Sequence, residues 1–365
     1  MPDKRRLDYI DALRGFACLW VILHHAFEGE RTLPKLLGYF CDIGWLGVSL
    51  FLVLSGFCLY YPLVRRQAPE TATVPLKSFF QRRARRILPP YYLSLVVALV
   101  FAAQFLHQNG QSLTGLTASW YDLPLHLLLL HNLTATTFAS LSSVTWSLAL
   151  EWQLYLIFPV LVALAARRGF HFLLVATLAI GLLWQGIAAC QLGVSRVWLP
   201  SLAVVYHALP GRVFEFTCGM LAALLVARPV PGQHRKALLI GGICLVPALT
   251  LVLFFYRLGP FCDPLWGVVF ASALVALSNT TPRHRLARAL VSIGERSYSI
   301  YLIHLLVMLA LPLPGSLAGS PVLAGLLRSS IALLAGLAFF TVAERPFLQK
   351  NNPRPAMRGG GFSIR

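Results

Sequence analysis

The sequence has few charged residues. Only 12% of its 365 residues are Asp, Glu, Lys or Arg, while 57% are hydrophobic. An ordinary globular chain has about 25% charged residues, and no soluble core needs this much apolar sequence. Apolar runs of about 20 residues recur to the end of the chain, which is typical of a polytopic membrane protein. We therefore expect an all-α membrane protein.

Several other signals are missing. The seven cysteines are scattered with no C-x-x-C pair, so no zinc site, disulfide scaffold or metal is expected, although Cys41 and Cys262 fall in predicted outer loops and could pair. No small-residue cleavage site follows the first apolar run, so a cleavable signal peptide is not expected. The net charge of +18 would suit a nucleic-acid binder. Its distribution indicates membrane topology instead, and no nucleic-acid partner is expected.

The apolar runs predict ten membrane-spanning helices with both termini cytoplasmic. Of the 31 lysines and arginines, 23 fall in the termini and alternate loops and only four in the opposite loops, as the positive-inside rule requires. We expect one membrane domain over 7–346 and a basic, disordered tail over 347–365. The segment 121–131 is too short to span and is expected to be re-entrant or on the surface. The expected helices are approximately 10–27, 43–62, 87–107, 144–166, 170–192, 208–227, 237–255, 264–281, 290–310 and 322–342.

The first apolar stretch, RGFACLWVILHH, has an arginine at one end and two histidines at the other. On an α-helix Arg14 and His25 lie within about 20° of one direction and about 16 Å apart, while His24 points about 80° away from Arg14. Charged groups in a bilayer are costly unless they face a polar interior. One face of this helix is therefore expected to line a polar cavity, although Arg14 reaching the interface and His25 capping the helix remain an alternative.

Four arginines occur together in FFQRRARRILPPYY, before a predicted helix at its cytoplasmic end. Such a cluster is often a topology signal or a lipid-headgroup contact. Guanidinium groups also bind phosphate in a bidentate way, so a phosphorylated ligand is an equal alternative. The four residues are Arg82, Arg83, Arg85 and Arg86.

Other polar residues interrupt the apolar runs. Glu151 lies about eight residues into the fourth helix, and an intramembrane glutamate is a functional candidate. Ser147 in the same segment and Ser49 near the outer end of the second helix are expected to line the site. Tyr301 and His304 belong to a polar stripe expected to face inward.

Two further charged pairs are read as structural. Arg212 and Glu215, three residues apart on one helix, are expected to form an ion pair. Glu344 and Arg345 are expected to end the last helix at the membrane interface.

Taken in chain order, seven motifs resemble the acyltransferase-3 family of integral membrane acyltransferases. They extend over nearly the whole chain, residues 7 to 346, in the family's order. The motifs are the Arg14-x10-His25 spacing, GVSLFLVLSGF, RRARRILPPYY, WSLALEWQLYLIFP, RVFEFTCG, SYSIYLIH and the final ERP.

The resemblance implies transfer of an acyl group, usually acetyl, from cytoplasmic acyl-CoA to a hydroxyl of an extracytoplasmic sugar, with no permanently bound cofactor. It places Arg14 and His25 at the centre of catalysis, Arg83 and Arg86 at the family's arginine pair, and Glu151 at its glutamate. Some members carry a soluble hydrolase-like domain after the membrane part. This chain ends without one, so a second step is expected to use another protein.

Two positions depart from the family pattern and suggest a modified acceptor pocket. Trp152 replaces a frequent second acidic residue, and Ser49 stands where an aspartate is common. The reaction itself is expected to be unchanged.

The expected arrangement has acyl-CoA phosphates at the arginine cluster and His25 removing the proton of the acceptor hydroxyl. Glu151 would orient a partner, and a buried arginine would stabilise the developing oxyanion. The acceptor is expected to be a carbohydrate or glycoconjugate at a bacterial cell membrane, or a small glycosylated metabolite. The alternative function is a proton-coupled secondary transporter. Two observations oppose it: the sequence has no repeated halves, and a proton relay would have no use for the cluster Arg82–Arg86.

Overall fold

All the described secondary structure is helical, as predicted. The structure, a computed structural model, describes residues 7–109, 117, 119–192, 200–228, 242, 262–278, 280–310 and 320–349, and no β-strand occurs among them. The elements are α1 (Asp8–Phe27), α2 (Lys35–Asp42), α3 (Leu46–Val64), η1 (Pro69–Thr71), α4 (Leu76–Gln108), α5 (Asp122–Leu127), η3 (His131–Leu133), α6 (Trp146–Arg168), α7 (Phe170–Leu192), α8 (Pro200–Tyr206), α9 (Leu209–Ala227), α12 (Asp263–Leu277), α13 (Arg285–Gly294), α14 (Ser297–Ala310), α15 (Pro321–Phe339), the π-helix η7 (Phe340–Glu344) and α16 (Arg345–Gln349).

The chain is a multi-pass membrane protein. Within the described residues, seven helices are long and apolar enough to cross a membrane, and the shorter apolar helices α12 and α14 occupy two more predicted spans. The predicted span at 237–255 lies outside the described residues. Large apolar side chains such as Val96, Val100 and Phe105 on α4 and Leu183 on α7 are exposed, as expected of surfaces that face lipid.

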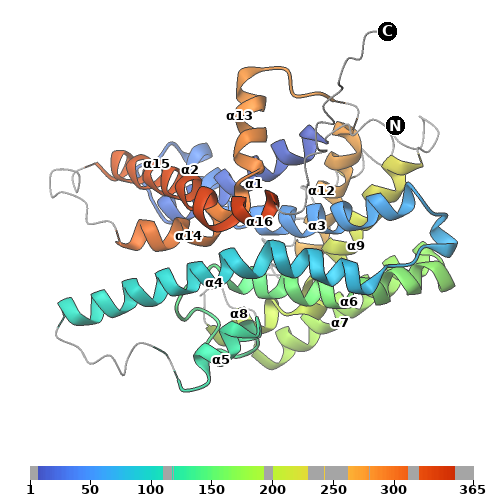
Figure 1. The fold of residues 1–365 in the computed structure, drawn as a ribbon, viewed down its shortest axis with the longest axis horizontal. Coiled ribbons are helices and arrows are strands. Elements are labelled where there is room, and N and C mark those ends of the chain that lie inside the picture. Colours follow the sequence, from blue (N-terminus) through green and yellow to red (C-terminus); the bar gives the residue numbers. More distant parts are fainter. Residues whose placement is uncertain are drawn as a thin grey trace, which may run out of the picture.

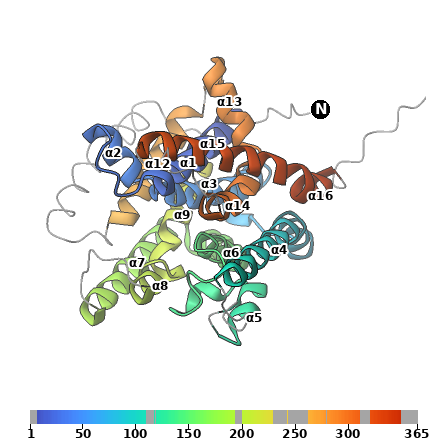
Figure 2. The ribbon, with the colours of Figure 1, turned by 90° about the vertical axis from the view of Figure 1, so that its left-hand side faces the viewer.

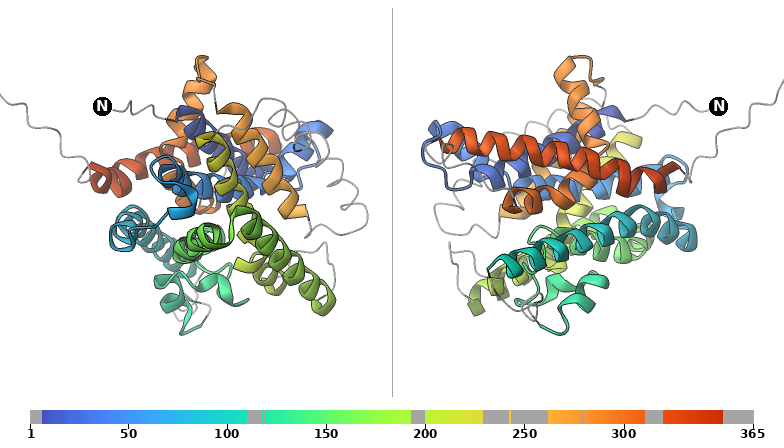
Figure 3. Two further views of the ribbon diagram at one scale, coloured as in Figure 1. Left: turned by 90° about the vertical axis from the view of Figure 1, so that its right-hand side faces the viewer. Right: turned by 60° about the vertical axis from the view of Figure 1, so that its left-hand side comes forward.

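The most buried of the long helices are α3 and α9, which pack against each other. In Figure 1, α4, α6 and α7 run along the long axis on one side of the molecule, with α14 and α15 on the other. Figure 2 looks along the bundle and shows α6 near its middle. Figure 3 shows α14 between α15 and α4, and it packs against both. α1 also contacts α3 and α14, and α3 contacts α6, so these helices and α4 approach one region.

The start of α4 differs from the prediction. The expected span begins at residue 87, whereas α4 covers 33 residues from Leu76 to Gln108 and contains Pro89 and Pro90. The four arginines therefore lie within the helix and not before it. The charged residues end the apolar run, but Arg, Lys and Gln are good helix formers, so the helix continues beyond the apolar run and its start was predicted too late.

The expected continuous helix at 290–310 is two helices. α13 ends at Gly294, the chain turns at Glu295 and Arg296, and α14 begins at Ser297. A Cβ at Gly294 would lie 1.7 Å from the carbonyl oxygen of Asp11, so the end of α13 lies directly against α1. Figure 1 shows α13 standing across the other helices. It docks on α1 and does not continue the span.

The structure also corrects three smaller expectations. Glu344 is buried and accepts a hydrogen bond of 2.6 Å from Ser299, and helical structure continues through η7 and α16 to Gln349, so Glu344 and Arg345 do not end the last helix as expected. Cys41 is a buried free thiol, so its pairing with Cys262 is not formed. The expected tail begins with the last residues of α16, which ends at Gln349, and residues 350–365 lie outside the described residues.

Two glycines allow α3 and α9 to approach closely. A Cβ at Gly56 would lie 2.0 Å from the carbonyl oxygen of Phe216, and one at Gly219 would lie 1.9 Å from that of Val53. Small residues at helix interfaces serve this purpose in membranes.

Gly56→Ala is expected to destabilise the protein by about 1–3 kcal/mol, because the added methyl forces α3 and α9 apart. The measurement is the thermal unfolding midpoint in detergent. Gly186→Ala on α7 is the matched control, since nothing lies within 4 Å of its Cβ position. Equal midpoints for the two variants would show that the close contact contributes nothing.

Candidate active site

A cavity lies where α1, α3, α4, α6 and α14 meet. Its volume is about 90 Å³, whereas one water molecule needs only ~10–15 Å³, so several waters or a small acyl group would fit. Aromatic and aliphatic side chains form much of the wall. Six of the residues singled out from the sequence line it: Arg14, Arg83, Arg86, Ser147, Glu151 and Tyr301.

Glu151 is held on the wall of the cavity by two neighbours. The hydroxyl groups of Ser55 on α3 and Tyr155 on α6 both donate hydrogen bonds to its Oε1 atom. Its second carboxylate oxygen makes no hydrogen bond among the described residues. One oxygen is therefore fixed in place, and the other is left for a ligand or a cation.

The guanidinium groups around the cavity are only partly neutralised. Arg14 lies 3.6 Å from a carboxylate oxygen of Asp11 and donates to the Sγ atom of Cys58 at 3.5 Å. Arg83 lies over the ring of Tyr155 at 5.7 Å, and its buried Nε makes no hydrogen bond among the described residues. With Arg86, three guanidinium groups face one carboxylate in the lining. This excess of positive charge favours an anionic ligand.

The arginine cluster is divided by the helix that carries it. Arg83 and Arg86, three residues apart, share the face of α4 that lines the cavity, as the helical repeat requires. Arg82 and Arg85 are exposed on another face. The structure therefore brings only two of the four predicted phosphate contacts to the site.

His25 does not line the cavity but reaches its wall through one neighbour. Its ring stacks on that of His304 with centroids 5.3 Å apart. The Nδ1 atom of His304 lies 2.7 Å from the carbonyl oxygen of Tyr301, and the Tyr301 hydroxyl lies 2.6 Å from that of Ser147. The rings of His304 and Tyr301 also lie 5.5 Å apart, so a chain of ring contacts links His25 to the cavity wall. His24, as expected, points elsewhere, toward the carbonyl oxygen of Cys41.

Ser49 lies in a separate cluster. It accepts a hydrogen bond of 3.0 Å from Arg212, which forms the expected ion pair with Glu215 at 2.7 Å and a second one with Asp263 at 2.5 Å. All four residues are buried. Ser49 thus helps to hold α3, α9 and α12 together, and its neighbours Val48, Phe51 and Leu52 line the cavity in its place.

The sequence reading missed two supporting residues. Tyr155 follows Glu151 by four positions, so helical spacing alone would have placed it beside the carboxylate. Ser55 lies on another helix, and no signal in the sequence indicates that it bonds Glu151.

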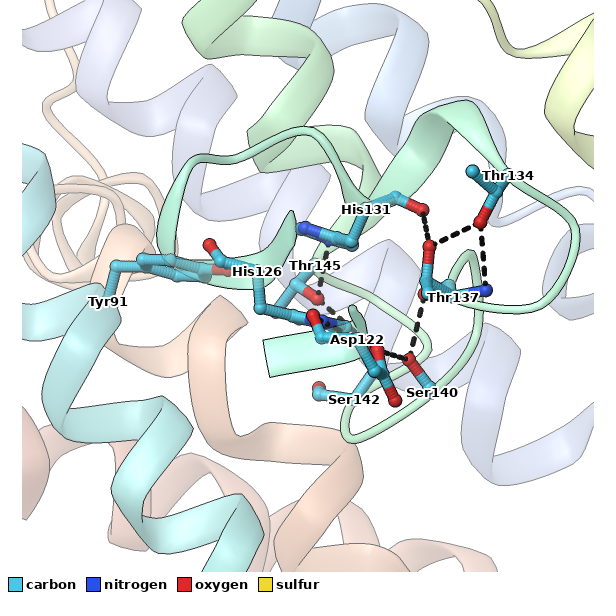
Figure 4. A network of polar contacts seen from close by, with 9 residues as sticks. All are labelled: Tyr91, Asp122, His126, His131, Thr134, Thr137, Ser140, Ser142 and Thr145. Carbon is cyan, nitrogen blue, oxygen red and sulfur yellow. Dashed lines mark hydrogen bonds and ion pairs between the residues drawn. The ribbon is translucent and has the colours of Figure 1, made fainter. Parts of the chain in front are cut away.

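The segment between α4 and α6 forms a buried polar network beside the start of α6. Figure 4 shows the stacked rings of His126 and His131, whose centroids are 4.0 Å apart. His126 Nδ1 lies 3.0 Å from Asp122 Oδ1, and His131 Nε2 lies 3.1 Å from the Thr145 hydroxyl. Since Thr145 directly precedes α6, the network fixes the end of the helix that carries Glu151.

This network is expected to be sensitive to acid. Burial and then the neighbouring His126 lower the pKa of His131 to about 3, and burial also lowers the pKa of His126. An unfolded histidine titrates near pH 6.5. Below that pH the unfolded state binds protons that the folded state does not, so stability falls as pH decreases from about 6.5 toward 3 and is unaffected above 6.5.

His131→Gln is expected to weaken this acid dependence, because it removes one such proton and with it up to about 1.4 kcal/mol per pH unit. The measurement is the thermal unfolding midpoint in detergent between pH 7.5 and 5. His107→Gln, at an exposed position, is the control. Parallel profiles for wild type and His131→Gln would contradict the role of this ring.

The sequence is similar to those of known acyltransferases. A family model described as an acyltransferase domain matches residues 7–345. Peptidoglycan O-acetyltransferase OatA of Listeria monocytogenes is 28% identical over 329 residues, which cover 83% of this chain and 49% of the relative. The chain thus spans about half the length of that protein.

Two further relatives match over most of both chains. Acyltransferase MdmB of Streptomyces mycarofaciens is 26% identical over 387 residues, covering 95% of this chain and 93% of its own. The putative membrane-bound transacylase BcsY of Komagataeibacter xylinus is 27% identical over 381 residues, covering 100% of this chain and 88% of its own. No solved structure matches the chain.

Proposed function

Because the chain belongs to the acyltransferase-3 family of membrane acyltransferases, we propose that it transfers an acetyl group from cytoplasmic acyl-CoA to a carbohydrate hydroxyl. The observation that carries this proposal is the single cavity that joins Arg83 and Arg86 to Glu151, Ser147 and Tyr301. The guanidinium groups of Arg83 and Arg86 suit the donor's phosphates, and the carboxylate and hydroxyl groups suit the reacting thioester and acceptor hydroxyl.

The proposed topology has ten spans in a single domain over 7–346, with both termini in the cytoplasm of a bacterial cell. The distribution of lysine and arginine supports it, and so does the occurrence of a helix at every predicted span within the described residues. In this topology the start of α4 faces the cytoplasm and the end of α1 faces outward. The donor and the acceptor then reach the cavity from opposite sides.

The acceptor is proposed to be a glycan at the cell surface. OatA, a relative named for peptidoglycan O-acetylation, supports a polymer of this kind, and a small glycosylated metabolite is the second acceptor class. Ser49 and Trp152 depart from the family pattern, but neither lines the cavity, so these departures do not support a modified acceptor pocket.

In the proposed reaction the acceptor oxygen attacks the thioester carbonyl carbon. The new C–O bond forms as the C–S bond breaks, and the hydroxyl proton passes to His25 and then to the departing CoA thiolate. Arg83 and Arg86 hold the phosphates of the donor, and the hydroxyls of Tyr301 and Ser147 line the same cavity, with His25 linked to Tyr301 through the ring of His304. At rest these hydroxyls bond each other and the carbonyl oxygen of Val144, and one of their protons is proposed to turn to the thioester oxygen as that oxygen gains charge.

Arg14 takes a role different from the one first expected. An ideal helix separates it from His25 by about 16 Å along the axis, which is too far for both groups to act on one atom. Its contacts with Asp11 and its place in the cavity lining suit the polar pantetheine arm of the donor. Stabilisation of the oxyanion is therefore assigned to the hydroxyl groups of Tyr301 and Ser147.

The test is a transfer assay with the purified protein in proteoliposomes. Labelled acetyl-CoA is supplied on one side and glycan fragments or glycosylated metabolites on the other. Transfer should yield an alkali-labile ester on the sugar. Failure to consume acetyl-CoA with any sugar acceptor, in protein that remains folded, would contradict the proposal.

Glu151→Gln is expected to lower kcat about tenfold with little change in KM for acyl-CoA. The amide oxygen can still accept from Ser55 and Tyr155, so the loss is that of charge alone, and tenfold corresponds to about 1.4 kcal/mol. The measurement is steady-state kinetics with acyl-CoA varied. The exposed Glu70→Gln serves as control, and a change confined to KM would contradict the assigned role.

A further inference from the structure

Three side chains with metal-binding atoms meet at the end of α1. Each of His24, His25 and Glu28 offers one ligand atom, and these atoms all lie within 4.8 Å of one another. The cysteine spacing predicts no metal site, and this cluster depends on adjacent histidines and a glutamate one turn beyond them. It is separate from the acidic and guanidinium groups of the cavity.

The ring of His24 is oriented as in known metal sites. Its Nδ1 atom lies 3.0 Å from the carbonyl oxygen of Cys41. A carbonyl can only accept, so Nδ1 carries the proton and Nε2 keeps its lone pair. That Nε2 atom lies 3.8 Å from a carboxylate oxygen of Glu28. Histidines that bind metal commonly donate their other N–H group to a backbone carbonyl in this way.

The remaining two groups complete a three-ligand set. The ring of His25 packs between those of His24 and His304, at 5.2 and 5.3 Å. The Glu28 side chain is 67% exposed. Its carboxylate is therefore free to move toward the two rings until each ligand atom lies ~2.0–2.2 Å from a zinc ion. Two imidazoles and one carboxylate with an open position suit zinc, whereas calcium and magnesium prefer oxygen ligands.

We propose that His24, His25 and Glu28 bind a zinc ion that inhibits acyl transfer, because the ion occupies the lone pair with which His25 would accept the acceptor's proton. The inhibitory effect rests on the proposed function, whereas the binding does not. In the proposed topology the site faces outward, so zinc outside the cell would control an enzyme whose donor is inside.

Binding is measured first, with tag-free protein in detergent titrated with Co²⁺ and followed by its visible absorption, then with Zn²⁺ in competition. Wild type should give a d–d spectrum that Zn²⁺ abolishes. Glu28→Gln should weaken Co²⁺ binding at least tenfold. Glu30→Gln is the matched control, since the Glu30 carboxylate already accepts two hydrogen bonds from Thr32, of 2.9 and 2.8 Å. Equal Co²⁺ affinity in wild type and Glu28→Gln, or equal loss in both variants, would overturn the site.

Inhibition is measured next, as the Zn²⁺ concentration that halves acyl transfer. Glu28→Gln should keep the basal rate and need at least tenfold more Zn²⁺, while Glu30→Gln should match wild type. Zn²⁺ that binds without lowering the rate would overturn the inhibitory role. If the protein transfers no acyl group at all, the Co²⁺ spectra still decide whether the site exists, so the two proposals fail separately.

Discussion

His25→Ala is expected to lower the rate of acyl transfer by about 10²–10⁴-fold, the range that a general base contributes. The ring stacks on His304 and reaches the cavity through Tyr301. Alanine removes the proton acceptor and leaves both helices in place. The measurement is the turnover number at saturating acyl-CoA, with membrane insertion checked by detergent extraction and gel filtration.

His24→Ala is the control for this prediction. Its ring bonds the carbonyl oxygen of Cys41 and does not stack on His304, so the rate should change by only a few fold. An inactive His24→Ala together with an active His25→Ala would show that the base has been assigned to the wrong ring.

Arg83→Gln and Arg86→Gln are each expected to raise the KM for acyl-CoA about ten- to a hundredfold, with a smaller change in kcat. A hydrogen bond to a charged group contributes roughly 1.5–3 kcal/mol, and about 1.4 kcal/mol corresponds to one decade of affinity. Loss of binding that is equal in the ground and transition states appears in KM. Lysine should rescue only in part, because it lacks the planar fork of guanidinium.

The helix supplies its own controls for the arginines. Arg82→Gln and Arg85→Gln remove the same charge from the same two turns, but at exposed positions outside the cavity. They should leave KM within about twofold of wild type. If all four variants raised KM equally, the cluster would act through its general field, and the cavity would not be the site of the phosphates.

Much of this arrangement follows from the sequence. Polar residues that interrupt apolar runs must find a polar interior, and Arg14, Glu151, Arg83 and Arg86 do meet in one cavity. The spans were predictable for the same reason, since hydropathy reflects the solvent that each segment faces.

The rest depends on contacts between helices that no local pattern contains. Ser49 and Ser55 lie on the same helix, but Ser49 bonds Arg212 and Ser55 bonds Glu151. Both α9 and α6 contact α3, and six residues of an α-helix leave two side chains about 120° apart. The break between α13 and α14 depends in the same way on the contact of Gly294 with α1.

Photo-crosslinking with an acyl-CoA that carries a diazirine in its acyl chain would test most directly whether this cavity is the site of transfer. After irradiation, labelled peptides are identified by mass spectrometry. Label is predicted on the cavity faces of α3, α6 and α14, at residues such as Phe51, Leu148 and Tyr298, and should be lost when excess acetyl-CoA competes. Competable label on the lipid-facing residues of α7, with none on these three helices, would contradict the assignment of the cavity as the acyl-transfer site.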